Sequence, residues 1–301
     1  MRRSARKRPG TFRSGAAALL LSAVLPLGLV PAPAAAARPL PVALPAPDAA
    51  PGPAVPADQR GLTGTVALSN CSGSLVRLPR SRPGDPALVL TNGHCLEGGA
   101  LEPGEVVTAR PANRAFTLLD RDGTELATLR SVRLVYATIT GTDVAVYRLT
   151  ASYTAIAARH GVTALTLDHR RPAAGTRVTV PSGYWKRVYR CAIDGFVPTL
   201  REGRWTMTDS LRFTPECATV AGTSGAPVLD RATGHVVGIN STGNDDGGHC
   251  TVHNPCEVGT DGTVTVRRGT NYGQQTYGLT RCFRPGSLLD LRAPGCALPG
   301  A

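Results

Sequence analysis

The chain has 301 residues, of which 42% are hydrophobic and 18% are charged, a balance that favours a folded globular protein over a disordered one. Its 33 lysines and arginines outnumber 21 acidic residues and give a formal net charge of +12. Six of these basic residues precede residue 14, and without them 27 basic residues face 21 acidic ones, a net charge of +6. This modest surplus, with no basic run, argues against a nucleic-acid-binding protein.

Residues 1–37 are typical of a secretory signal peptide. A basic stretch from Arg2 to Arg13 precedes an apolar run from Ala16 to Val30, and four alanines at 34–37 provide a small-residue cleavage site. The apolar run is too short to cross a bilayer comfortably, which disfavours an uncleaved anchor. We therefore expect a secreted protein that leaves the membrane after cleavage. The pair Arg2-Arg3 leaves the choice between general and twin-arginine export open.

Residues 38–58 are rich in proline and alanine, a composition that disfavours regular secondary structure. This segment is predicted to be an extended linker or a short propeptide, and the sequence favours neither. From residue 59 onward short apolar runs alternate with Gly, Pro and Asp, so the folded domain is expected over 59–301.

Short β-strands dominate the prediction for this domain. Asp122-Gly123 predicts a hairpin turn between two of them, and residues 151–160 alone suggest a helix. The strands are expected at 87–90, 116–119, 126–129, 143–149, 177–180, 204–208, 235–239 and 263–266. Many short strands separated by turns indicate an all-β barrel or sandwich.

Three motifs supply a histidine, an aspartate and a serine in that order along the chain. His94 stands in residues 91–95 (Thr-Asn-Gly-His-Cys), Asp143 opens an apolar strand, and Ser224 stands in residues 222–227 (Gly-Thr-Ser-Gly-Ala-Pro). A serine hydroxyl becomes a good nucleophile when an imidazole takes its proton and a carboxylate orients that imidazole. The motifs therefore predict nucleophilic catalysis.

These motifs resemble those of the chymotrypsin-like (trypsin-like) serine proteases, over roughly residues 59–282. The resemblance implies two antiparallel six-stranded β-barrels, at about 59–150 and 160–282, with the active site in the cleft between them. It implies a secreted serine endopeptidase acting on proteins or peptides, with His94 as general base and acid, Asp143 orienting it and Ser224 forming the acyl-enzyme. We expect a monomer without a cofactor or metal.

The resemblance also assigns the groups around the nucleophile. The backbone N–H groups of Gly222 and Ser224 are expected to form the oxyanion hole, which stabilises the tetrahedral intermediate. Ser241 and Gly243 match the family strand that pairs with the substrate backbone.

Three positions depart from the family pattern. Thr223 replaces the aspartate that pairs with a newly cleaved N-terminus in trypsin, so we expect activation without insertion of an N-terminus. Ala218 replaces the aspartate that binds Arg or Lys, and Asn240 replaces the histidine of glutamyl endopeptidases. The preference for the residue before the scissile bond (P1) therefore stays open. Asp245 and Asp246 are expected to lie in a solvated turn.

Eight cysteines, an even number in an exported chain, predict disulfide bonds, although about a hundred pairings are possible. The family resemblance implies Cys71–Cys95, and we expect Cys191–Cys217 to brace the loop before Ser224. The simplest local pairs that remain are Cys250–Cys256 and Cys282–Cys296. An alternative for the Cys250, His253 and Cys256 cluster is zinc binding.

Two other functions are alternatives to this prediction. A protease-like domain that no longer cleaves could serve as a binding module, an alternative that Thr223 and Ala226 leave open. An α/β-hydrolase esterase would need its Asp and then its His after Ser224, together with alternating helices and strands. Only 77 residues follow Ser224 and helices are scarce, which disfavours this alternative.

Overall fold

The computed structural model describes residues 56–300. The signal peptide expected over 1–37 and most of the segment expected over 38–58 lie outside these residues. The end of that segment belongs to a short helix, α1 (Ala57–Arg60), which follows Pro56. Proline is tolerated at a helix start because the first N–H groups have no partner inside the helix. Across the described residues, no helix is long and apolar enough to span a membrane.

The first sheet contains a closed ring of six strands. The ring follows the order β1-β5-β6-β7-β3-β2, and β2 pairs back with β1. The strands of this sheet are β1 (Thr65–Ala67), β2 (Ser72–Arg77), β3 (Pro86–Thr91), β4 (Val106–Pro111), β5 (Ala115–Leu119), β6 (Glu125–Thr138), β7 (Val144–Ser152) and β8 (Leu165–Thr166).

Strand β8 differs from the predicted division of the chain, which places residues after 160 in the second barrel. It pairs in parallel with Val76 and Arg77 of β2. The short strand β1 covers β2 only over Ser72–Ser74, so the backbone beyond is free to pair with β8. Residues 165–166 therefore extend the first sheet.

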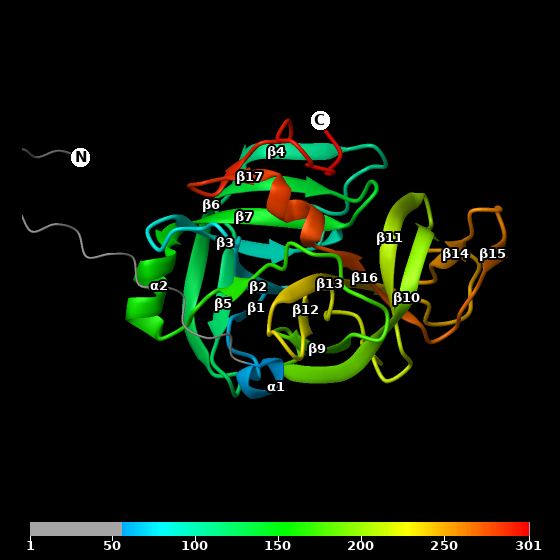
Figure 1. Ribbon diagram of the computed structural model, residues 1–301, viewed down its shortest axis with the longest axis horizontal. Helices are drawn as coiled ribbons and strands as arrows, with labels where there is room; N and C mark the ends of the chain where they lie inside the picture. The colour runs from blue at the N-terminus through cyan, green and yellow to red at the C-terminus, as the bar shows by residue number, and fades with distance from the viewer. Residues whose placement is uncertain (1–55, 301) are drawn as a thin grey trace, which may run out of the picture. The chain divides into compact units, whose positions relative to one another are not determined.

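The second sheet contains another ring of six strands, in the order β11-β16-β13-β12-β9-β10, closed because β10 pairs with β11. The two sheets follow one another along the chain, from blue to green and from green to orange in Figure 1. The strands of the second sheet are β9 (Arg177–Ser182), β10 (Arg187–Glu202), β11 (Trp205–Phe213), β12 (Pro227–Asp230), β13 (Val236–Gly243), β14 (Cys256–Val258), β15 (Val264–Thr265) and β16 (Asn271–Gln275).

The remaining elements are short. They are the helix α2 (Tyr153–His160), the 3₁₀-helices η1 (Gly93–Cys95) and η2 (Tyr277–Arg281), and the hairpin strands β17 (Phe283–Arg284) and β18 (Leu288–Leu289). The predicted helix at 151–160 is confirmed as α2, which Ser152 caps by accepting a hydrogen bond from the Ala155 N–H. The predicted hairpin at Asp122-Gly123 is confirmed between β5 and β6, with Gly123 at φ 89°.

Strand β7 contributes side chains both to the core of the first barrel and to the contact between the barrels. Ala145 and Tyr147 point into the core of the first barrel, whereas Val144 and Val146 join a second cluster. That cluster also contains Ile239 of β13 in the second barrel. A strand that is buried on both faces reads as a continuous apolar run, as β7 does.

The predicted all-β fold of two barrels is confirmed. Apart from the short β2–β8 pair and isolated bridges, the pairings among the described strands are antiparallel. The alternating helices and parallel strands that an α/β-hydrolase requires are absent from residues 56–300, so that alternative is wrong.

Candidate active site

Residues from both barrels line one cleft. His94 and Asp143 come from the first barrel and Ser224 from the second, and all three lie in this cleft. Ser241 and Gly243, at the end of β13, line it as well. Gly222 lines it too, so the structure brings together the six positions that the sequence proposes for catalysis and substrate binding.

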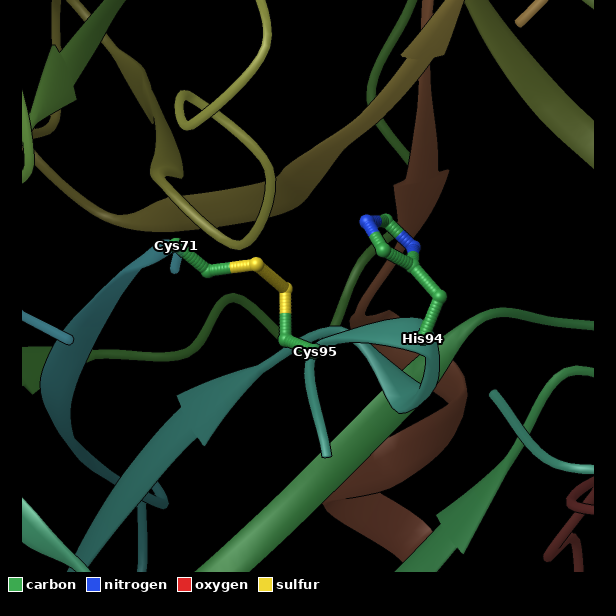
Figure 2. Close-up of side chains that lie close together, drawn as sticks. All are labelled: Cys71, His94 and Cys95. Carbon is green, nitrogen blue, oxygen red and sulfur yellow. A yellow bond between two sulfur atoms is a disulfide. The ribbon is translucent and has the colours of Figure 1, made fainter. Parts of the chain in front are cut away.

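His94 lies in the single turn of η1, directly after β3. Figure 2 shows its imidazole beside the disulfide that joins Cys71 to Cys95. The side-chain amide of Asn92 donates a 2.8 Å hydrogen bond to the Asp143 carbonyl, which ties this turn to the chain before β7. These contacts fix the backbone of the histidine relative to the aspartate.

The Asp143 carboxylate is buried and accepts three hydrogen bonds. The donors are His94 Nδ1 at 2.7 Å, the His94 N–H at 3.1 Å and Ser241 Oγ at 2.8 Å. The Asp143 side chain is 2% exposed and the His94 side chain 33% exposed. A buried carboxylate needs such donors, because desolvation without them is costly. The imidazole is thereby oriented from behind while one side stays open to the cleft.

The charges of this pair shift both pKa values. Burial of the imidazole acts to lower the pKa of His94, but the Asp143 charge and hydrogen bond outweigh it, so the His94 pKa is raised above its ordinary value. Burial acts to raise the pKa of Asp143, but the charge of His94 and the three hydrogen bonds outweigh it and lower that pKa. Asp143 is therefore held as a carboxylate beside a more basic imidazole.

The backbone of Ser224 is fixed by both barrels. Its carbonyl accepts a 2.8 Å hydrogen bond from the Ser72 N–H, and the next residue, Gly225, donates one of 2.8 Å to the Asn240 carbonyl. The Ser224 hydroxyl donates to the Ser241 carbonyl at 3.1 Å. In this state the hydroxyl is turned toward Ser241, and a rotation about its Cα–Cβ bond is needed to direct it elsewhere.

The turn before Ser224 presents unused donors. Gly222 has φ 88°, a conformation that favours glycine. The N–H groups of Thr223, Gly225 and Ala226 donate to backbone carbonyls, whereas those of Gly222 and Ser224 have no acceptor among the described residues. This is the arrangement that an oxyanion hole requires before a ligand binds.

Side chains outside this turn hold its shape. Ser72 Oγ donates to the Gly222 carbonyl at 2.9 Å, and the indole Nε1 of Trp185 donates to the Ala221 carbonyl at 2.7 Å. The Tyr184 ring lies so close to Gly222 that a Cβ there would be 2.7 Å from it. Neither Ser72 nor Trp185 stands in a motif that identifies the turn, so the sequence did not reveal this support.

Neutral polar groups line the cleft beside Ser224. Thr219 Oγ1 donates to Asn240 Oδ1 at 3.1 Å, and the side-chain amide of Asn271 donates to the Cys217 carbonyl at 2.9 Å. Asp245 and Asp246 are both exposed, as expected for a solvated turn, and of the two only Asp245 also lines the cleft.

Thr223 is fully buried, and its hydroxyl has no hydrogen-bond partner among the described residues. The position that usually carries a charged aspartate therefore holds a small neutral side chain. The turn is held instead by the Ser72 and Trp185 contacts.

One part of the cleft was not anticipated from the sequence. The hairpin between β10 and β11 contributes Glu202, Trp205 and Met207, and the loop before β14 contributes Val252 and His253. The sequence predicts one strand of this hairpin, at 204–208, but a strand pattern does not indicate what the hairpin faces.

The structure contains four disulfides, in the pairings expected from the sequence: Cys71–Cys95, Cys191–Cys217, Cys250–Cys256 and Cys282–Cys296. Four disulfides are typical of an extracellular or periplasmic protein. The bond between Cys250 and Cys256 removes the two thiolates that the zinc alternative requires. The cluster of Cys71, His94 and Cys95 has ligand-like spacing, but its sulfurs are bonded to each other as well.

The fold resembles several solved proteases at low sequence identity. The MamO protease domain from Magnetospirillum magneticum is 14% identical, with 75% of this chain and 99% of that one covered and a TM-score of 0.47. A Nocardiopsis protease is 16% identical, with 72% and 90% covered and a TM-score of 0.41. The thermostable serine protease AL20 from an extremophilic microorganism is 17% identical, with 73% and 93% covered and a TM-score of 0.41.

A search of curated proteins finds no match to this chain. The family model described as the trypsin-like peptidase domain matches residues 71–239, which include His94, Asp143 and Ser224. This match spans more than half of the chain. The chain has the double-barrel fold described above. The chain therefore belongs to the trypsin-like peptidase domain family, a family of hydrolases that cleave peptide bonds.

Proposed function

We propose that the protein is a secreted serine endopeptidase that cleaves proteins or peptides through an acyl-enzyme on Ser224. The observation that carries this proposal is the 2.7 Å hydrogen bond between His94 and the buried Asp143, in the cleft that Ser224 also lines. A histidine with one nitrogen held by a carboxylate presents its other nitrogen as a base.

In the first step the Ser224 hydroxyl turns from the Ser241 carbonyl toward His94 Nε2 and attacks the carbonyl carbon of the substrate. His94 accepts the serine proton, and Asp143 stabilises the resulting imidazolium. The N–H groups of Gly222 and Ser224 donate to the oxyanion, an interaction whose loss typically costs about 10²–10³ in rate. The raised pKa of His94 makes it a stronger base for this transfer.

Collapse of the intermediate breaks the C–N bond, and His94 gives its proton to the departing amine. A water molecule then loses a proton to His94 and attacks the acyl carbonyl. The new C–O bond replaces the ester bond to Ser224, which regains its proton from His94. The enzyme returns unchanged, and no cofactor enters the balance.

A fluorophosphonate probe tests the nucleophile directly, because it reacts with activated serines and not with ordinary ones. We expect labelling of Ser224 in the wild-type protein, identified by peptide mass spectrometry, and none in His94→Ala. A folded wild-type protein that stays unlabelled would favour the alternative of a catalytically silent binding module.

We further propose that activation does not depend on insertion of a new N-terminus. Thr223 lacks the charge for such an ion pair, and Ser72 and Trp185 already hold the turn before Ser224. Protein that begins within 38–58 is expected to be active, and acetylation of its N-terminus is expected to leave the activity unchanged. An enzyme that acetylation abolishes would refute this proposal.

We also propose that the protein is exported and monomeric. The signal peptide at 1–37 is expected to be removed, so mass spectrometry of the secreted protein should find no Met1 terminus. The secreted form is expected to elute from size exclusion as a monomer.

A further inference from the structure

The hairpin of β10 and β11 reaches across the cleft to the first barrel. At its tip Glu202 pairs with Trp205, and the Trp205 indole Nε1 donates a 2.8 Å hydrogen bond to the Leu101 carbonyl. Arg204 forms an ion pair with Glu102 at 2.6 Å. These contacts anchor the hairpin tip to both barrels, so its side chains hold defined positions along one wall of the cleft.

The Glu202 carboxylate is fixed within this wall. Its Oε1 accepts a 2.8 Å hydrogen bond from the His253 N–H. His253 and Thr242 line the same cleft as Glu202. The neighbouring Arg204 forms its ion pair with Glu102 and not with Glu202.

The surroundings of Glu202 leave its charge poorly compensated. Ile139, Met207 and Val252 contribute apolar surface to the same cleft. Burial raises the pKa of Glu202 above its ordinary value, although the His253 hydrogen bond and the Thr242 hydroxyl act in the opposite direction. A carboxylate of this kind gains most from a cation brought by a ligand, because ion pairs strengthen where water is excluded.

The position of Glu202 indicates which substrate residue it meets. The substrate carbonyl under attack must lie at Ser224, and Ser241 to Gly243 are expected to pair with the extended chain before it. The residue preceding P1, named P2, then lies beside the exposed part of His94, because neighbouring side chains of an extended strand point in opposite directions. Glu202 lines the same cleft as His94, and its negative charge acts to raise the pKa of His94.

We infer that Glu202 is a specificity residue that binds a lysine or arginine side chain at P2 of the substrate. This inference rests on the proposed function, since it names the substrate class of the same cleft. The alternative is a structural role, in which Glu202 only holds the loop at His253 against the hairpin through its hydrogen bond. A structural role predicts equal effects on all substrates, whereas the inference predicts a change in preference.

The test compares two peptides that differ only at P2, Arg or its neutral counterpart Gln, in wild type and Glu202→Gln. Glutamine can still accept the hydrogen bond from the His253 N–H, so the variant removes the charge and keeps the brace. We expect wild type to cleave the Arg peptide with a kcat/KM about tenfold above the Gln peptide, and Glu202→Gln to show a ratio near one. Asp245→Asn, which alters another acidic residue of the cleft, should keep the tenfold ratio.

Binding of the same peptides to Ser224→Ala, with and without Glu202→Gln, separates this inference from the proposed function. Fluorescence anisotropy should show about tenfold tighter binding of the Arg peptide, lost on Glu202→Gln, even if the wild-type protein cleaves nothing. Equal binding of both peptides, or a preference that Asp245→Asn removes and Glu202→Gln retains, would overturn the assignment to Glu202.

Discussion

Ser72 Oγ donates a 2.9 Å hydrogen bond to the carbonyl of Gly222, a residue 150 positions later in the sequence. Ser72 lies on β2 of the first barrel, and Gly222 lies in the turn that the second barrel contributes to the site. The same hydroxyl contacts Ser182 Oγ at 3.0 Å and accepts from the Tyr184 N–H at 3.1 Å. One side chain of β2 thus connects the oxyanion turn to residues 182–184.

Ser72→Ala should impair both the turn and the fold, since it leaves the Gly222 carbonyl without this donor. We expect kcat to fall about tenfold, with a smaller change in KM, and the free energy of unfolding to fall by about 1–2 kcal/mol. Peptide kinetics and urea denaturation measure the two effects.

Ser74→Ala is the matched control on the same strand. Ser74 is equally buried, but its hydroxyl has no partner among the described residues, so its removal should change stability by less than about 0.5 kcal/mol. Equal losses in the two variants would contradict the role assigned to Ser72.

The pH dependence of kcat/KM should report the His94–Asp143 pair. Neutral His94 is the base, and its pKa is raised above 6.5, so activity should fall as the pH drops through a value above 6.5. Asp143→Asn removes the charge that stabilises the imidazolium. It should shift the acid limb of the kcat/KM profile, where activity falls, to lower pH and reduce kcat by about 10⁴-fold.

Asp245→Asn should leave the acid limb of the kcat/KM profile at the same pH, because Asp245 does not contact His94 in the described structure. A limb that stays at the same pH in Asp143→Asn would argue against the assigned pair.

The acid stability of the fold should depend on Asp143. Its pKa in the folded protein lies below the ordinary value of 3.8, so its stabilising contribution is full above 3.8 and is lost as the pH falls through the lower folded value. In a Ser224→Ala background, which prevents self-digestion, Asp143→Asn should therefore destabilise most near neutral pH. Urea denaturation at several pH values should show the difference shrinking in acid, and a difference that grows there would contradict this sign.

The two disulfides of the second barrel should differ in their contribution to stability. Cys191–Cys217 links residues 26 positions apart and Cys250–Cys256 residues 6 apart. Because a longer closed loop restricts the unfolded chain more, replacing both Cys191 and Cys217 by Ala should cost about 1 kcal/mol more than the same change at Cys250 and Cys256. Thermal unfolding of both variants makes the comparison, and a larger cost for the shorter loop would exclude this explanation.

The sequence predicts those site residues that stand in short, recognisable motifs. His94, Asp143 and Ser224 each stand in a short motif, and the order of the motifs indicates the fold that brings them together. β10 was missed because Gly195 and Pro198 interrupt its apolar pattern. The strand continues through Gly195 with a shift in its pairing to β11, which only the tertiary structure reveals.

Glu202 could not be assigned from its neighbours in sequence. Its hydrogen bond to His253 spans 51 residues, and its place in the cleft depends on Trp205 reaching Leu101, 104 residues earlier. Contacts of such separation carry no local pattern, since they follow from how the two barrels pack. The support of Gly222 by Ser72 escaped prediction for the same reason.

The central claim is that Ser224 forms an acyl-enzyme during peptide-bond hydrolysis. Digestion of casein by the secreted wild-type protein beside Ser224→Ala, with product termini read by mass spectrometry, tests it most directly. We predict cleavage by wild type and a loss of at least about 10³-fold in Ser224→Ala, with both proteins equally folded. Undiminished cleavage by folded Ser224→Ala would contradict the claim.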